Sequence, residues 1–152
     1  MTRDEAIALV NAAIDSVLAR EPALLDLGVT ERALSHQLAR YMSEMVQSPL
    51  SVDCEYNRHF ADPKRLNLPR RDAIDREIRA TTVFPDVIVH ERNTDARNLL
   101  VLELKKPGED TAYDALKLQA FRRELGYAHA AHVILGRRAN GELVRQVEWV
   151  DG

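Results

Sequence analysis

The chain has 152 residues, which suits one domain spanning 1–152, and its 45% hydrophobic content is enough to bury a substantial core. Its 21 lysines and arginines are outnumbered by 24 aspartates and glutamates, so a nucleic-acid-binding surface would have to be local rather than general. A single cysteine, Cys54, excludes an internal disulfide framework and a cysteine-based zinc site. No apolar run approaches the ~20 residues of a membrane span, and the charged N-terminus lacks a signal core, so we expect a cytoplasmic protein without a membrane partner.

The N-terminal third predicts two helices and a strand. A T-x-x-E capping box at Thr2 begins a helix over 2–20. Thr30 can cap a second helix, whose apolar stripe continues to Met45. Residues 51–56 alternate between apolar and acidic side chains, which is typical of a half-buried strand.

The middle of the chain predicts a loop and then a hairpin. Residues 57–80 are polar and are expected to form mostly a long loop, in which Ile74 and Ile78 could anchor one short helix. Two apolar runs follow, 82–90 and 98–105, and the linker between them is polar and turn-prone. This arrangement predicts a β-hairpin.

The remaining segments complete a mixed fold. A third helix is expected over 111–125 with Gly126 at its end, followed by a short buried strand over 130–135 and an edge strand over 143–150. The helix would connect the strand 98–105 to its neighbour as a β–α–β crossover. We therefore expect a mixed α/β fold of the α+β kind, in which helices flank a central mixed β-sheet in the order α-α-β-β-β-α-β-β.

The hairpin places charged residues together. Glu103 and Lys105 are two positions apart and project from one face of their strand, whereas Leu102 and Leu104 project from the other. Counting outward from the turn sets Asp86 opposite or nearly opposite Glu103. Paired side chains on one sheet face have Cβ atoms only ~4.5–5.5 Å apart.

Two carboxylates at this separation need a positive neighbour. At ~5 Å and an effective dielectric constant of ~20, their repulsion costs about 3 kcal/mol. Lys105 lies on the same face, but a divalent cation is the better explanation. Oxygen ligands without a cysteine or histidine cluster suit Mg²⁺ or Mn²⁺.

These residues also resemble a known family. Pro85-Asp86 followed by Glu103-Leu104-Lys105 fits the PD-x(n)-(D/E)-x-K signature of restriction-endonuclease-like nucleases. Segments 84–90 and 98–106 are similar to small bacterial members of this superfamily, as are shorter stretches around Asp53 and Asp114. The resemblance spans roughly 30–136.

The resemblance implies specific roles. Asp86 and Glu103 would bind the metal, and the backbone carbonyl of Leu104 would add a ligand. Lys105 would orient or help deprotonate the attacking water and offset charge on the phosphate. Glu31 would complete the metal shell, directly or through water; its place in the first turn of a helix is explained equally well by the helix dipole.

Three further residues are weaker candidates. Lys117 and Gln119 could contact phosphate or water, although two helical positions apart they should not point the same way. Glu55 could approach the site from its strand, but a structural pairing with Arg58 is the slightly better interpretation. The five histidines show no paired ligand spacing.

Two functions are weighed on these grounds. The leading hypothesis is a metal-dependent endonuclease that hydrolyses phosphodiester bonds, with DNA favoured over RNA. The alternative is a non-catalytic module that binds nucleic acid or protein on the same fold. Because the chain has no recognisable DNA-reading motif, we expect weak or structure-based selectivity, a second subunit in a homodimer, or a targeting partner protein.

Overall fold

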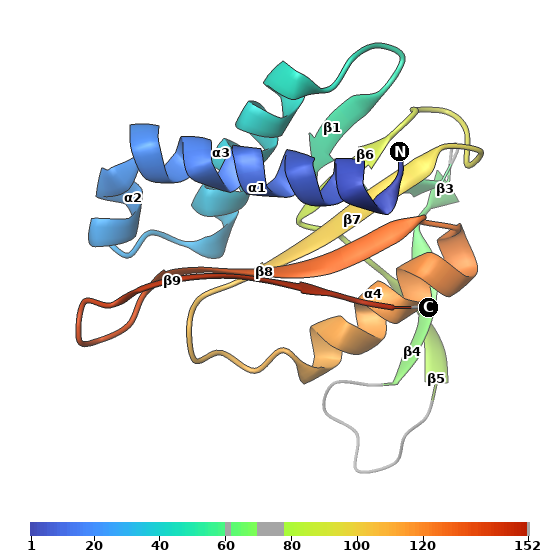
Figure 1. Cartoon of the computed structure of the whole chain (residues 1–152). Coiled ribbons are helices and arrows are strands. Elements are labelled where there is room, and N and C mark those ends of the chain that lie inside the picture. The colour runs from blue at the N-terminus through green and yellow to red at the C-terminus, as the bar shows by residue number, and fades with distance from the viewer. Residues whose placement is uncertain (60–61, 70–77, 152) are drawn as a thin grey trace.

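The computed structural model describes residues 1–59, 62–69 and 78–151 (Figure 1). The described helices are α1 (Arg3–Arg20), α2 (Pro22–Asp26), α3 (Glu31–Met45) and α4 (Ala112–Leu125). The described strands are β1 (Ser51–Cys54), β2 (Arg58–His59), β3 (Asp62–Pro63), β4 (Arg65–Pro69), β5 (Ile78–Thr82), β6 (Val87–His90), β7 (Asn98–Lys105), β8 (His129–Arg137) and β9 (Leu143–Trp149).

A five-stranded mixed sheet forms the centre of the fold. Its strand order is β1-β6-β7-β8-β9, and β7 and β8 are its one parallel pair. The hairpin of β6 and β7 and the β7–α4–β8 crossover confirm two predictions from the sequence. The last strand, β9, lies at the edge of the sheet, also as expected.

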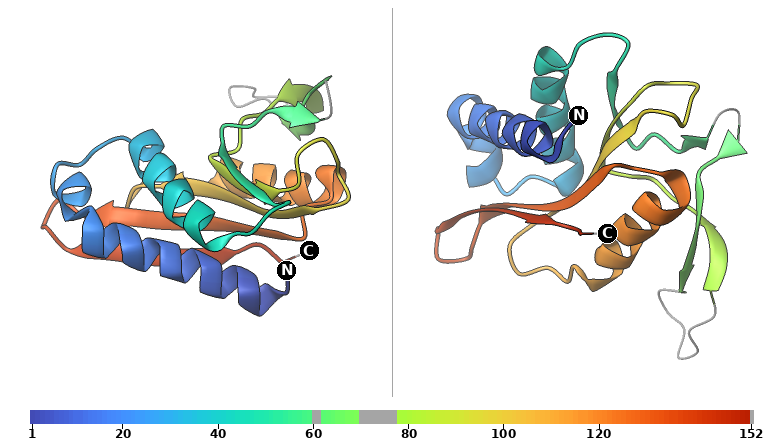
Figure 2. Two further views of the ribbon diagram at one scale, coloured as in Figure 1. Left: turned by 90° about the horizontal axis from the view of Figure 1, so that it is seen from above. Right: turned by 45° about the vertical axis from the view of Figure 1, so that its right-hand side comes forward.

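Helices cover both faces of this sheet (Figures 1 and 2). On one face α1 and α3 bury apolar side chains against alternate residues of β6, β7 and β8. On the other face α4 and the β4–β5 ribbon share a second core, in which Phe121 packs against the sheet. The sheet is therefore apolar on both faces, which explains why every residue of β6 is buried.

The two long N-terminal helices begin where their caps predict. Thr2 and Glu5 form the reciprocal hydrogen bonds of the capping box. The Thr30 side chain accepts a hydrogen bond from the backbone of Ala33 at the start of α3. The short helix α2 was not predicted. It begins at Pro22, because proline is favourable at the first position of a helix, where its missing N–H is not needed.

The prediction of a long loop over 57–80 is wrong for the described part of that segment. It contains two short antiparallel pairs, β2–β3 and β4–β5. In β4, Leu66 and Leu68 alternate with polar residues and are buried beneath α4, a strand pattern too short to stand out among polar neighbours. Of the two residues expected to anchor a helix, Ile78 begins β5, and Ile74 lies outside the described residues.

Two strand boundaries also differ from expectation. The run 82–90 is not one strand, because Thr82 ends β5 and β6 begins only at Val87. Pro85, which has no backbone N–H to contribute to a ladder, lies in the irregular segment between them. In β1 the pairing stops at Cys54, since Glu55 adopts a left-handed conformation with φ of 49°.

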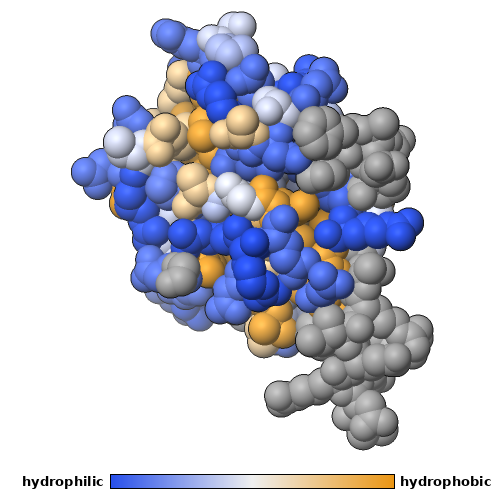
Figure 3. All heavy atoms as spheres, turned by 90° about the vertical axis from the view of Figure 1, so that its right-hand side faces the viewer, coloured by the Kyte–Doolittle hydropathy of each residue, from blue (hydrophilic) through white to orange (hydrophobic). Residues whose placement is uncertain are grey.

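The end of the molecule that bears the β4–β5 ribbon is mainly hydrophilic, with hydrophobic atoms gathered near its middle (Figure 3). Among the described helices, none has the length and apolar character that crossing a bilayer requires.

Candidate functional site

The register of the hairpin brings Asp86 to Glu103. Val87 pairs with Leu102, so the next position outward on each strand joins the two acidic residues. Leu102 and Leu104 point into the core beneath α1 and α3, which leaves Glu103 and Lys105 on the α4 side of the sheet. The juxtaposition predicted by counting along the two strands is confirmed.

A backbone hydrogen bond fixes the orientation of Asp86. Its Oδ2 accepts from the Leu104 N–H at 2.7 Å, just before β6 begins. Burial raises the pKa of Asp86, and this hydrogen bond opposes the rise because it favours the ionised form. The side chain is therefore held against β7 at a defined position.

Glu103 is buried, and only one of its two carboxylate oxygens has a hydrogen-bond partner. Its side chain is 4% exposed, and its Oε2 lies 2.8 Å from the ammonium of Lys117. Its Oε1 is buried and has no hydrogen-bond partner. Burial raises the pKa of Glu103 to about 8, because desolvation outweighs the attraction of Lys117. An orphaned carboxylate oxygen of this kind calls for a donor or a cation.

Lys105 lies between acids from two helices. Its Nζ is 3.0 Å from Asp114 Oδ2 on α4 and 3.6 Å from Glu31 Oε2 on α3. Burial by itself lowers the pKa of Lys105, but the hydrogen bond and charge of Asp114, together with Glu31, raise it overall. The lysine is thus charged and held at the face where Glu103 emerges.

Glu31 reaches the site from the start of α3. Its pKa rises to about 7, first through burial and then through a hydrogen bond with Glu109, while Lys105 opposes the rise. The expected placement of Glu31 beside the hairpin is confirmed, and its contact with Lys105 gives it a neighbour that capping alone would not explain.

Three residues of this region were missed by the sequence analysis. Asp114 pairs with Lys105, and Glu109 hydrogen bonds with Glu31. His132 lies beside Glu103 in the parallel register of β7 and β8; it is buried, its Nε2 has no partner, and burial lowers its pKa. The spacing of Asp114 and Lys117 on one helix could have indicated a shared face, but nothing in the sequence singles out His132.

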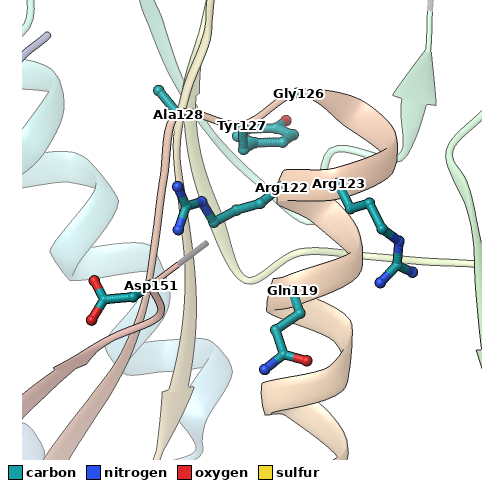
Figure 4. Close-up of a pocket in the computed structure, with 7 residues that line it drawn as sticks. All are labelled: Gln119, Arg122, Arg123, Gly126, Tyr127, Ala128 and Asp151. Carbon is teal, nitrogen blue, oxygen red and sulfur yellow. The ribbon is translucent and has the colours of Figure 1, made fainter.

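The weaker candidates divide as follows. Lys117 belongs to the site, since its Nζ contacts Glu103 and lies 3.3 Å from the carbonyl of Phe84. Gln119 does not, because it lines a pocket of about 530 Å³ at the C-terminal part of α4, beside Arg122 (Figure 4). Glu55 forms an ion pair with Arg32 at 2.8 Å, which agrees with the favoured structural role, although the partner is Arg32 rather than the expected Arg58.

The residues fit a hard divalent cation with few protein ligands. No group of three histidine, cysteine, aspartate or glutamate side chains in the described part of the chain is arranged to hold a metal. Mg²⁺, however, is commonly bound through one or two carboxylates and keeps several waters. Asp86 and the unpartnered Oε1 of Glu103 offer that donor set, to which a backbone carbonyl such as that of Leu104 could add.

Comparisons with known proteins add nothing to the interpretation of these residues as a metal site. A search against protein-family models, curated proteins and solved structures finds no match to the chain.

Proposed function

We propose that the chain is a metal-dependent nuclease of the PD-(D/E)xK type that hydrolyses phosphodiester bonds, with DNA as the favoured substrate. One observation carries the proposal: the hairpin register joins Asp86 and Glu103 on a face that also presents Lys105. A buried acid and a partly buried acid beside ordered lysines are the combination that phosphodiester hydrolysis needs for cation binding and for charge stabilisation.

The chain's own residues have distinct tasks in this proposal. Asp86 and Glu103 would hold Mg²⁺ or Mn²⁺, which supplies Lewis-acid stabilisation of the phosphate and lowers the pKa of bound water. Lys105 orients the attacking water and offsets the charge that develops on the phosphate oxygens. Asp114 and Glu31 keep the Lys105 ammonium charged and in place. Lys117 holds the Glu103 carboxyl group in place before the substrate binds and adds a second positive charge near the phosphate.

A restriction-endonuclease-like core is part of the same proposal. The five-stranded mixed sheet, with the acidic residues on an antiparallel hairpin and the crossover helix α4 covering one face, supports it. In this arrangement α4 supplies Asp114 and Lys117 to the site, and α3 supplies Glu31 from the opposite side. Chain elements from both layers would therefore build one catalytic centre.

The alternative, a non-catalytic binding module, is favoured by a different observation. Both lysines already have carboxylate partners, Lys105 with Asp114 and Lys117 with Glu103, so the charges are largely balanced without a cation. A network of this kind could have a structural role, without catalysis, in a nucleic-acid- or protein-binding domain. The unpartnered Glu103 Oε1 weighs against this, because a purely structural network would be expected to satisfy it.

The substrate would be selected by more than the catalytic hairpin. The sequence has no recognisable DNA-reading motif, and the net charge of −3 gives no general attraction to DNA. We therefore propose that a homodimer or a targeting partner protein contributes to substrate choice.

A cleavage assay tests the proposed function. Purified protein is incubated with supercoiled plasmid and with single-stranded DNA in Mg²⁺ or Mn²⁺, with EDTA as the metal-free control. The comparison variants are Lys105→Ala and Lys106→Ala. Lys106 is the matched control, because it follows Lys105 directly but its Nζ hydrogen bonds to the carbonyl of Gly28 rather than to the acids.

We expect metal-dependent cleavage by the unchanged protein and by Lys106→Ala, and its loss in Lys105→Ala. Equal cleavage by Lys105→Ala would point to a contaminating nuclease and overturn the assignment. If no DNA is cut, the same assay with single-stranded RNA decides whether the enzyme or the binding module is the better description.

A further inference from the structure

The segment that leads into Asp86 is fixed at every residue. The Val83 N–H donates to the Lys64 carbonyl at 3.1 Å, and the Phe84 carbonyl accepts from Lys117 at 3.3 Å. The Pro85 carbonyl accepts a hydrogen bond from the Glu55 N–H at 2.9 Å, and the Asp86 carboxylate accepts one from the Leu104 N–H. Both Val83 and Pro85 are buried. This segment is therefore held rigidly although it is not part of a strand.

Phe84 is exposed in the middle of this rigid segment. Its side chain is 52% accessible, whereas the neighbouring Val83 is buried in the core beneath α4. An exposed aromatic ring on a fixed backbone offers a large apolar face for a stacking contact at little further cost in conformational entropy. Phe84 is also the one aromatic residue among the large hydrophobic side chains exposed in the described part of the chain.

The position of Phe84 relates it to the acidic pair. It is two residues before Asp86, and its carbonyl contacts the same Lys117 that pairs with Glu103. A phosphate held by the proposed metal and by the site lysines would thus lie close to the backbone segment from which the exposed ring projects. The nucleotide attached to that phosphate would bring its base to the same rim of the site.

From this arrangement we infer that Phe84 is a stacking platform for an unpaired nucleobase next to the phosphate that is cleaved. The inference rests on the proposed function and deepens it, because it names the substrate class as single-stranded or locally unpaired nucleic acid. Bases within a duplex are stacked on one another and do not offer a face to a side chain, whereas unpaired bases stack readily on aromatic rings. A surface for a protein partner would not require the ring to project from a segment whose backbone contacts a site lysine.

Binding, rather than cleavage, tests the inference. The affinity of the protein for a labelled single-stranded oligodeoxynucleotide and for the matching duplex is measured by fluorescence anisotropy. Ca²⁺ replaces Mg²⁺ to limit cleavage. The variants are Phe84→Ala, Phe84→Trp and Met45→Ala. Met45 is the matched control, because it is an exposed hydrophobic residue (41% accessible) at the end of α3 opposite to Glu31.

We expect Phe84→Ala to weaken single-strand binding roughly tenfold or more, which is the order of effect that loss of a base–aromatic stack produces. Phe84→Trp and Met45→Ala should bind as the unchanged protein does, and duplex binding should not depend on residue 84. In an oligonucleotide scanned with single abasic sites, one abasic position should weaken binding to the unchanged protein and have no further effect on Phe84→Ala.

The outcomes separate the two proposals. If the unchanged protein binds the single strand but Phe84→Ala binds it equally well, the stacking platform is wrong while the nuclease stands. An equal loss of duplex affinity in Phe84→Ala would overturn the preference for unpaired bases. If no nucleic acid binds to the unchanged protein, both the inference and the proposed function fail.

Discussion

The ammonium of Lys117 on α4 lies 2.8 Å from the buried carboxylate of Glu103 on β7. Both side chains are largely withdrawn from water, with exposed fractions of 14% and 4%. In such surroundings an acid that loses its partner either remains charged at a high cost or takes up a proton. Because burial has already raised the pKa of Glu103 to about 8, protonation is the easier response at neutral pH.

The first prediction concerns Lys117→Met. At pH 6 Glu103 is protonated with or without the lysine, so the free energy of unfolding should fall by about 1 kcal/mol or less. At pH 9 the unchanged protein has an ionised, paired Glu103, whereas the variant must bury an unpaired charge or retain the proton. The loss should then approach ~3 kcal/mol. Urea unfolding at the two pH values measures this difference, and equal losses at both would show that Glu103 is ionised throughout.

Lys106→Met is the control for this experiment. Its side chain hydrogen bonds to a backbone carbonyl at the surface and does not contact the buried acids. Its effect on the free energy of unfolding should be small and the same at both pH values.

The second prediction concerns Asp86. Asp86→Asn retains an oxygen that can accept from the Leu104 N–H, so the fold should be kept while Mn²⁺ binding is lost. Asp86→Ala removes that acceptor and leaves a partly buried amide without a partner, at a cost of about 1–3 kcal/mol. The relief of repulsion with Glu103 acts in the opposite direction. Titration calorimetry with Mn²⁺ and urea unfolding test the two statements, and undiminished Mn²⁺ binding by Asp86→Asn would remove Asp86 from the metal site.

Much of this arrangement is visible in the sequence because it depends on local periodicity. The alternation of apolar and charged residues around Glu103 fixes which side chains face α4. Counting from the turn also sets Asp86 opposite Glu103, but the final register includes a shift between Val89 and His90 that the sequence does not reveal. Cap residues such as Thr2 and Thr30 likewise act on the residues that follow them directly.

The parts that were missed depend on contacts between distant segments. Asp114 enters the site because α4 crosses over β7, and the position of a crossover helix along its strand is set by packing rather than by a local pattern. His132 becomes a neighbour of Glu103 only through the register of two parallel strands joined by that helix. Leu66 and Leu68 form a strand because they are covered by α4, whereas their polar neighbours suggest a loop.

The third prediction is a pH dependence of stability in EDTA. The folded-state pKa of Glu103 is about 8, above the ordinary glutamate value of 4.5, so the folded protein binds more protons than the unfolded chain between these values. The contribution of Glu103 to stability is therefore greatest below pH 4.5 and is lost as the pH rises toward 8. Glu31, with a pKa of about 7, acts in the same direction over a narrower range.

Glu103→Gln isolates this effect. The buried His90 and His132 have lowered pKa values, so they destabilise the protein as the pH falls and act in the opposite direction. The difference in melting temperature between the unchanged protein and Glu103→Gln removes the histidine contribution. It should move in favour of the variant as the pH rises from 5 to 8, and a constant difference would contradict the raised pKa.

The last prediction concerns His132. Its Nε2 is buried without a hydrogen-bond partner next to Glu103, whose Oε1 is in the same state. Two such atoms on neighbouring strands are costly for the fold, and their retention is explained if they order water beside the proposed metal. His132→Leu should therefore leave the free energy of unfolding unchanged or raise it by about 1 kcal/mol, because an unsatisfied polar group is removed.

The same substitution should lower the rate of metal-dependent cleavage, and His132→Gln, which keeps polar atoms at the end of the side chain, should recover part of it. Urea unfolding and the cleavage assay, performed on both variants, measure the two effects separately. A variant that loses several kcal/mol of stability while its cleavage rate is unchanged would assign His132 to the core, since a residue that serves only the site would produce the opposite pattern.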